Sequence, residues 1–188
     1  MLTAIKQRLE RDEEEGFTLI ELMVVVLIIA ILLAIAIPTF LGARNSANAR
    51  AAQSDLRNAL TAEQTQWTNT QAFDATTTDM SGVESGISWT STAPAGTTVP
   101  NQVYVVAGTF TGGATSAVVL LQAQGKDNNC YEILQSNDPA SSFTGYNEIA
   151  GTCTAADATL PTAAPTLSAS SAHASYKTNS ATTWFTEF

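Results

Sequence analysis

The residues from Leu22 to Ile37 form an uninterrupted apolar run, and an acidic residue, Glu21, stands directly before it. Counted from Phe17 to Ile37, the segment has 21 residues. As a helix it would be roughly 30 Å long, at about 1.5 Å per residue, which is enough to cross the hydrocarbon core of a bilayer. An ionised side chain in mid-membrane costs on the order of 2.5–3.5 kcal/mol by insertion scales. The position of Glu21 therefore requires an explanation.

Three interpretations of this segment compete. It is an ordinary membrane anchor in which Glu21 stays hydrated near the interface, or a secretory signal peptide, since Ala34-Ile35-Ala36 has the small-x-small form of a cleavage site. The third is an anchor in which Glu21 has a specialised role. Against the signal peptide, the run is longer than a usual signal core, and the acidic residues 12–15 precede it where a basic flank is expected.

The sequence GFTLIE, from Gly16 to Glu21, followed by the apolar run and Pro38, resembles the N-terminus of type IV pilins and of related proteins that prepilin peptidase processes. The resemblance covers roughly residues 1–60. It implies that residues 1–16 are a leader, that cleavage falls between Gly16 and Phe17, and that the new amino group of Phe17 is methylated. It also identifies Glu21 and Pro38 with the family's carboxylate and proline at these offsets, which serve filament assembly.

Phe17 and Glu21 are four residues apart, so on a helix the new ammonium group and the carboxylate lie on one face and can neutralise each other in the membrane. In a filament the carboxylate would pair with the terminal ammonium of a neighbouring copy, which would set the register between subunits. The resemblance further implies three partners, namely prepilin peptidase, a cytoplasmic assembly ATPase and a membrane platform. It places the protein in the cytoplasmic (inner) membrane as a single-pass protein before assembly and in an extracellular filament afterwards.

The expected fold is α+β, the type IV pilin fold, in which a long kinked N-terminal helix packs on a small antiparallel sheet. We expect one helix over 17–68, because an amphipathic stripe continues beyond Pro38. Pro38 would bend or locally melt this helix, and Gly42 would make melting easier; alternatively Pro38 ends it and a second helix starts near Asn45. The stripe consists of Ala49, Ala52, Leu56, Ala59, Leu60 and Trp67, with Arg44, Arg50, Asp55, Arg57 and Glu63 largely between them.

A globular head is expected over 69–154. Residues 69–101 are rich in Thr, Ser, Gly and Pro and predict a connecting loop with one short strand at 87–91. Three runs with strand character follow, separated by glycine-containing turns, and they predict an antiparallel meander. These runs are Gln102–Phe110, Ala117–Gln124 and Cys130–Gln135.

The two cysteines, Cys130 and Cys153, fall in the part that the resemblance places outside the cytoplasm. A disulfide between them would close a loop of about 24 residues and contribute roughly 3 kcal/mol, whereas two unpaired thiols are the alternative. The disulfide would tie a loop at 136–152 to the sheet edge, as the C-terminal disulfide loop does in many pilins. The region 155–188 is rich in Ala, Thr and Ser and predicts an exposed stalk or flexible strand, whose apolar end at 184–188 packs in the core, forms an adhesive patch or is disordered.

Other function classes find little support in the sequence. The net charge of −9, without any cluster of Lys and Arg, argues against a nucleic-acid groove. The one histidine, His173, lies in the low-complexity tail, and no nucleophile, phosphate-binding loop or cysteine spacing typical of a metal site occurs. We therefore expect neither an enzyme nor a bound metal or cofactor.

The sequence thus predicts a type IV pilin subunit that assembles with copies of itself. One alternative is a pseudopilin of a type II secretion system, which shares residues 16–38 with pilins, and another is a monomeric membrane-anchored surface binding protein. Adhesion, motility, DNA uptake and surface sensing are not separated by the sequence, nor are major and minor subunits.

Overall fold

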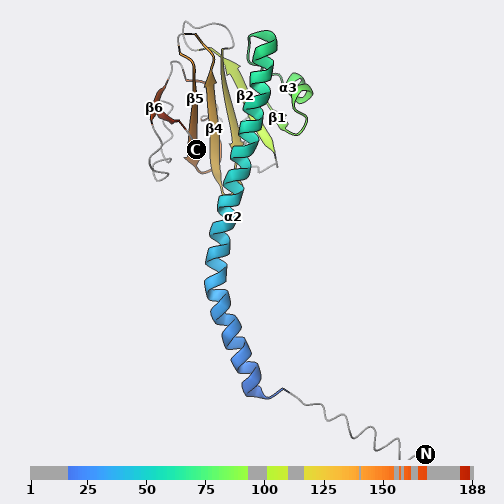
Figure 1. The fold of residues 1–188 in the computed structure, drawn as a ribbon, viewed down its shortest axis with the longest axis vertical. Helices are drawn as coiled ribbons and strands as arrows, with labels where there is room; N and C mark the ends of the chain where they lie inside the picture. Colours follow the sequence, from blue (N-terminus) through green and yellow to red (C-terminus); the bar gives the residue numbers. More distant parts are fainter. Residues whose placement is uncertain are drawn as a thin grey trace, which may run out of the picture. The chain divides into compact units, whose positions relative to one another are not determined.

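In a computed structural model of the 188-residue chain, the residues described are 17–92, 101–109, 117–139, 141–154, 157, 159–161, 165–168 and 183–186. The leader residues 1–16, Gly16 included, and His173 lie outside them. The chain divides into two compact units, Met1–Ala43 and Arg44–Phe188. Figure 1 shows the fold and labels most of its elements.

One helix, α2 (Leu19–Thr70), runs through both units and contains Pro38 in its interior. The hypothesis that Pro38 ends the membrane helix is therefore wrong, while the kink expected there stays a prediction. Proline has no backbone N–H, so the carbonyl of Ala34 loses its usual helical donor. One residue on, the hydroxyl of Thr39 donates to the carbonyl oxygens of Ile35 and Ala36 at 3.1 and 2.9 Å, so the hydroxyl itself is satisfied within the helix.

The head contains a seven-stranded sheet with the strand order β1-β2-β3-β4-β5-β7-β6. Strands β2 to β5 form an antiparallel meander, and the pairs β1–β2 and β6–β7 at the two edges are parallel. The expected α+β fold, with a long N-terminal helix and a mostly antiparallel sheet, is confirmed. The strands are β1 (Ser88–Thr90), β2 (Gln102–Gly108), β3 (Val118–Gln124), β4 (Asn129–Ser136), β5 (Phe143–Ala150), β6 (Thr166–Ser168) and β7 (Thr183–Phe185).

The three predicted strands correspond to β2, β3 and β4 within a residue or two, although Phe110 lies outside the described residues. Two predictions about loops are wrong. The segment 69–101 contains a short helix, α3 (Thr77–Val83), which forms because Met80 is buried in the core. The segment 136–152 contains β5, whose inward positions are Gly145, Asn147 and Ile149 and therefore show no apolar alternation in the sequence.

The main core lies between the sheet and the later part of α2, which Figure 1 shows running along the sheet. The predicted stripe is confirmed, because Ala52, Leu56 and Ala59 are buried there and Ala49, Leu60 and Trp67 pack against them. Glu63 is the exception. The pattern placed it among the polar positions, yet its side chain is fully buried, because α2 turns this position toward the core beside the segment that precedes α3.

The opposite face of the sheet carries a smaller core cluster of Val118, Leu120, Leu134 and Trp184. Trp184, on β7, is only 3% exposed, so of the three alternatives for the chain end the structure supports core packing at this residue. Because β6 and β7 join the sheet, the tail is not simply an exposed stalk. The stretch 169–182 lies outside the described residues.

Candidate functional site

The first turn of α2 is closed by two residues that hold each other. Thr18 precedes the helix, and the N–H of Glu21 donates to its hydroxyl oxygen at 3.3 Å. In return, the N–H and the hydroxyl of Thr18 donate to Oε2 of Glu21 at 2.8 and 2.6 Å. This reciprocal arrangement is a capping box, which satisfies two of the N–H groups that every helix start leaves without a partner.

The capping box gives the carboxylate of Glu21 a fixed position in the first turn. All three hydrogen bonds of the box go to Oε2 or to the Thr18 hydroxyl, so Oε1 remains available to a cation. The sequence analysis identified Glu21 but missed Thr18. The signal that could have revealed it is the pattern Thr18-x-x-Glu21 directly before an apolar run, which is typical of a capped helix start.

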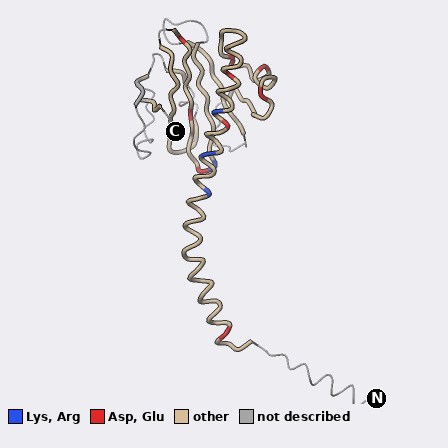
Figure 2. The backbone as a smooth tube through the Cα atoms, viewed as in Figure 1, with Lys and Arg blue, Asp and Glu red and all other residues tan. Residues whose placement is uncertain are grey.

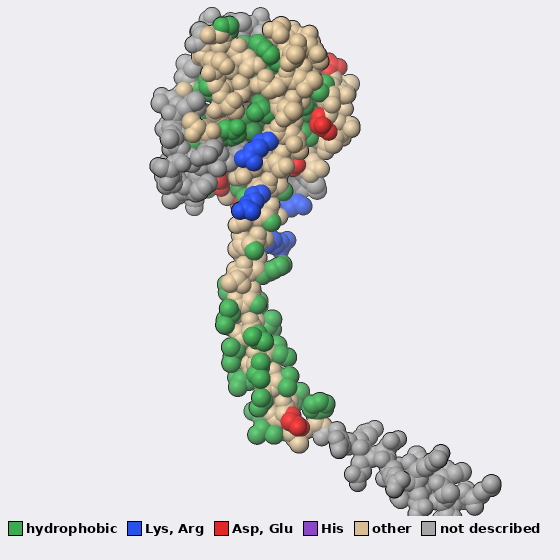
Figure 3. Space-filling model, viewed as in Figure 1, with side chains coloured by type: hydrophobic (Ala, Val, Ile, Leu, Met, Phe, Trp, Pro, Cys, Tyr) green, Lys and Arg blue, Asp and Glu red, His purple; other side chains and the backbone are tan. Residues whose placement is uncertain are grey.

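The apolar side chains that follow Glu21 are exposed along the whole first unit. Phe17 is 85% exposed, and each of the large apolar residues from Leu19 to Leu41 exposes about half of its side chain or more. Within the described residues, α2 is long and apolar enough to cross a membrane, and its apolar window is not buried at all. A helix of this kind requires a membrane or other apolar helices around it. Figure 3 shows apolar side chains on the visible face of this part of α2.

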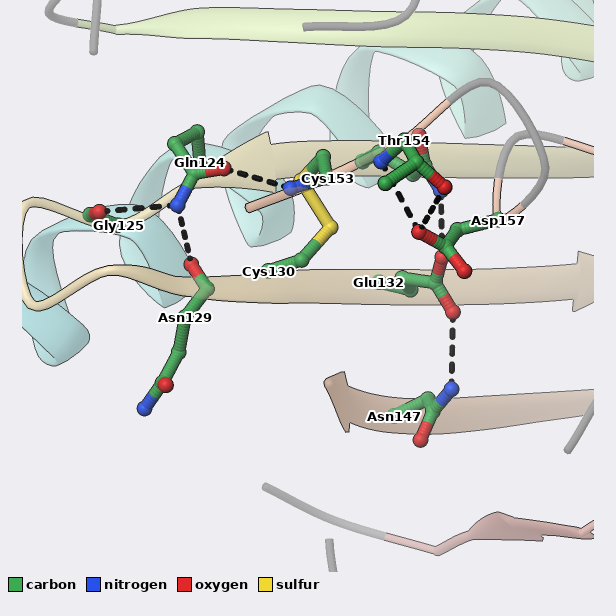
Figure 4. Close-up of a disulfide and its surroundings, with 10 residues drawn as sticks. Gln124, Gly125, Asn129, Cys130, Glu132, Asn147, Cys153, Thr154 and Asp157 are labelled. Atoms are coloured by element: carbon green, nitrogen blue, oxygen red, sulfur yellow. Dashed lines mark hydrogen bonds between the residues drawn. A yellow bond between two sulfur atoms is a disulfide. The ribbon is translucent and has the colours of Figure 1, made fainter. Parts of the chain in front are cut away.

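Cys130 and Cys153 form a disulfide, which settles the alternative of two unpaired thiols. Cys130 lies on β4 opposite Ile149 of β5, and Cys153 follows β5 by three residues, so the bond fixes the chain just after the meander. The side chain of Gln124 holds the same segment by hydrogen bonds. Its oxygen accepts from the N–H of Cys153 at 2.7 Å, and its amide nitrogen donates to the carbonyl oxygen of Asn129 at 3.0 Å (Figure 4).

Two carboxylates are buried inside the head. Glu132 lies on the face of the sheet away from α2 and accepts hydrogen bonds from the side-chain amides of Gln122 and, at 2.9 Å, Asn147. Burial raises the pKa of Glu132 to about 7, against the effect of these two hydrogen bonds. Figure 4 shows Asp157 beside it, and the charge of Asp157 raises the pKa of Glu132 further.

Glu63 is the second buried carboxylate, on the face of α2 that meets the sheet. Its Oε2 accepts from the N–H of Asp74 at 3.2 Å, while Oε1 is buried without a hydrogen-bond partner. Burial raises the pKa of Glu63 to about 8, so this side chain is mostly protonated at neutral pH. In the part of the chain that the structure describes, neither Glu63 nor Glu132 belongs to a group of three or more His, Cys, Asp or Glu residues that could hold a metal ion.

A family model described as the prokaryotic N-terminal methylation motif matches residues 12–37. The match covers the acidic residues before Gly16, the GFTLIE sequence and the apolar run that begins α2. No curated protein and no solved structure matches the chain.

Proposed function

Because the chain carries the N-terminal methylation motif that characterises the prepilin leaders of type IV pilin-like proteins, we propose that it is a structural subunit of a type IV pilus. In this proposal prepilin peptidase cleaves between Gly16 and Phe17 and the new amino group of Phe17 is methylated. The first unit anchors the protein in the cytoplasmic membrane and then, after extrusion by an assembly ATPase and a membrane platform, lies inside an extracellular filament.

The observation that carries the proposal is the exposed apolar part of α2 with a capped carboxylate at its start. Such a surface is stable in two settings, a bilayer and a bundle of like helices, and a pilin occupies both in turn. The helix can move from the membrane into the bundle at little cost in hydrophobic free energy, because both surroundings are equally apolar. The fit between helices and the pairing of polar groups then determine which of the two the helix prefers.

Glu21 provides the polar pairing in this proposal. Cleavage after Gly16 would create an ammonium group at Phe17, four residues before Glu21 and next to the cap residue Thr18, just before α2 begins and not on its face. Thr18 occupies Oε2 of the carboxylate, so the ammonium of the same chain or of a neighbouring copy would bind Oε1. A charge that is costly in lipid then favours assembly, because only a correctly placed neighbour neutralises it.

The test compares Glu21→Gln with Glu21→Asp. The Gln variant keeps the size of the side chain but removes its charge, and we expect filament yield to fall at least about tenfold while leader cleavage continues. The Asp variant keeps the charge on a shorter side chain, and we expect an intermediate yield. Sheared surface filaments and the N-terminus of the membrane-bound protein are measured in parallel. A normal filament yield for Glu21→Gln would contradict the proposed role.

Deletion of the gene distinguishes a type IV pilus subunit from a subunit of a type II secretion system. Loss of long surface fibres with intact secretion is the result expected of a pilin. A secretion defect without loss of surface fibres would instead assign the chain to the pseudopilins of a type II secretion system. A protein that forms no filaments and does not depend on Glu21 would be a monomeric membrane-anchored binding protein.

A further inference from the structure

The charged side chains of the head are unevenly distributed. Five basic residues follow the leader, and Lys177 lies outside the described residues. The other four lie on the first 14 residues of the second unit's helix, at Arg44, Arg50 and Arg57, and on the turn between β3 and β4, at Lys126. Figure 2 shows these positions in blue, gathered at the start of the second unit, with acidic positions in red on and next to α3 farther along α2. We call three of the basic residues, Arg44, Arg50 and Lys126, the basic end. We call Asp74, Asp79 and Glu84 the acidic edge.

The side chains at the basic end face the solvent. Arg44, Arg50 and Lys126 are all exposed. The acidic residues of the same region are less available. Asp55 and Glu148 are half-buried, and Glu148 accepts a hydrogen bond from Asn129 at 2.8 Å. Asp127 accepts hydrogen bonds from Tyr131 at 2.6 Å and from Asn129 at 3.2 Å. The basic end therefore presents its positive charges outward and holds part of its negative charge inward.

At the acidic edge the most accessible carboxylate is that of Asp79, on α3. Asp74 and Glu84 are partly buried and accept backbone hydrogen bonds from Thr76 and Gly86. The N–H of Asp74 donates to Glu63, which lies 13 residues beyond Arg50 on α2, or about 20 Å at about 1.5 Å per residue. Asp74, the first residue of the acidic edge, thus lies on the order of 20 Å along the helix from Arg50, so Arg50 and Asp74 are not a local ion pair within one chain.

We propose that the basic end of one copy contacts the acidic edge of the next copy, with Arg50 facing Asp79. This inference rests on the proposed function, because it requires parallel copies that are staggered along a common axis. A helical filament supplies such a stagger, and opposite charges on the two surfaces would then fix which heads meet and exclude contacts between like surfaces. The contact is heterologous, so it continues along the fibre without closing.

Anionic lipid headgroups are a poorer match for the basic end. Counted along α2, Arg50 lies nine residues beyond Leu41, the last large apolar residue of the exposed segment, which is about 14 Å of helix. The headgroup layer is only about 5–8 Å thick on each side of the hydrocarbon core, so it would reach Arg44 but not Arg50. The acidic edge of a second copy is opposite in charge to the basic end and can therefore contact Arg44, Arg50 and Lys126 together.

The experiment exchanges the charges in the full-length protein and measures sheared filaments. We expect Arg50→Glu and Asp79→Arg each to lower filament yield about fivefold, as is reasonable for one surface pair of about 1 kcal/mol in a repeated contact. The combined variant should restore the yield. Arg50→Lys and Asp79→Glu, which conserve charge, are the matched controls and should assemble normally.

A second measurement does not depend on yield. The chain with both Arg50→Cys and Asp79→Cys should form disulfide-linked ladders in oxidised filaments, whereas neither single variant should, because the described cysteines are already paired and free cysteines are absent there. If filaments assemble but no ladder forms and the combined exchange fails to restore yield, the inference is wrong while the pilus proposal stands. If Arg50→Glu instead only weakens binding to vesicles of anionic lipid, the partner is the membrane and the inference is also wrong. If the unaltered chain forms no filaments, the proposed function itself fails.

Discussion

Glu63 shows how a single residue couples the head to pH. Its side chain is fully buried and keeps one oxygen without a hydrogen bond, so the charged form is strongly disfavoured in the folded state. The pKa of Glu63 is about 8 in the folded protein, against an ordinary value of 4.5. Between these two values the folded state holds a proton that the unfolded state has lost. The free energy of unfolding must therefore fall as the pH rises through this window.

We predict that Glu63→Gln removes much of this pH dependence. At pH 5 the side chain is neutral in both folded proteins, and the ionisation of Glu63 in the unfolded chain lowers the free energy of unfolding by only about 1 kcal/mol or less. At pH 8 the variant should be more stable by on the order of 4 kcal/mol, because it has no carboxyl group that ionises in the unfolded state. Denaturant unfolding of the full chain in detergent at several pH values measures this. Glu132, whose pKa is about 7, contributes a slope of the same sign in both proteins. Equal pH slopes for the two proteins would contradict the account of Glu63.

Thr18 acts on assembly through Glu21. Its N–H and hydroxyl both hold Oε2 of the carboxylate, so removal of the hydroxyl leaves one bond of the two. We predict that Thr18→Val lowers filament yield about three- to tenfold, since loss of a capping group costs about 1 kcal/mol and leaves Glu21 less well oriented. Thr18→Ser keeps the hydroxyl and should assemble normally. Quantified sheared filaments provide the measurement, and equal yields for the Val and Ser variants would show that the cap has no part in assembly.

Single functional residues can be predicted from the sequence where a charged side chain stands among apolar neighbours. Glu21 is conspicuous because it begins an apolar run, whereas Thr18 is not, since its role depends on a hydrogen bond to a side chain three residues away. Glu63 was placed on the polar side of α2 because it is charged. Its burial follows from the chain at Asp74, which folds back over this turn and supplies an N–H, a tertiary contact that a helical pattern does not contain.

The elements were predictable where their apolar pattern is strong. The stripe on α2 and the runs of β2, β3 and β4 have the periods of a helix and of strands, and the structure places them as expected. α3 was missed because its sequence, TTDMSGV, carries few apolar residues. β5 was missed because the large apolar residues of FTGYNEIA recur every three residues and do not alternate as in a strand. α3 is held by one buried side chain, Met80, and β5 by full pairing with β4, so both depend on neighbours more than on their own propensity.

The disulfide connects two secondary-structure elements, because it ties the residues that follow β5 to strand β4. It closes a loop with a sequence separation of 23, for which the loop-entropy estimate is about 3 kcal/mol. We predict that replacing Cys130 and Cys153 together by Ser lowers the free energy of unfolding by about this amount. Denaturant unfolding is the measurement, with the unaltered protein in reductant as control. A loss well below 1 kcal/mol would show that Gln124 and the strand pairing hold this region without the bond.

The whole molecule combines two units with different requirements. The first is an exposed apolar helix that needs a membrane or a bundle of helices, and the second is a head with its own core on both faces of a sheet. The sequence predicts this division because the apolar run and the strand runs are separate along the chain. It predicts much less of the tail, where low-complexity sequence surrounds the short strands β6 and β7, and where Trp184 is buried among the described residues.

The central claim, prepilin processing at the start of α2, is tested most directly by mass spectrometry of the N-terminal peptide from protein sheared off the cell surface. The account predicts a peptide that begins at Phe17 and carries one added methyl group. A peptide that begins at Met1 would mean an uncleaved anchor, and one that begins at Ile37 would mean an ordinary signal peptide. Either result would contradict the claim and remove the role of Glu21 in assembly with it.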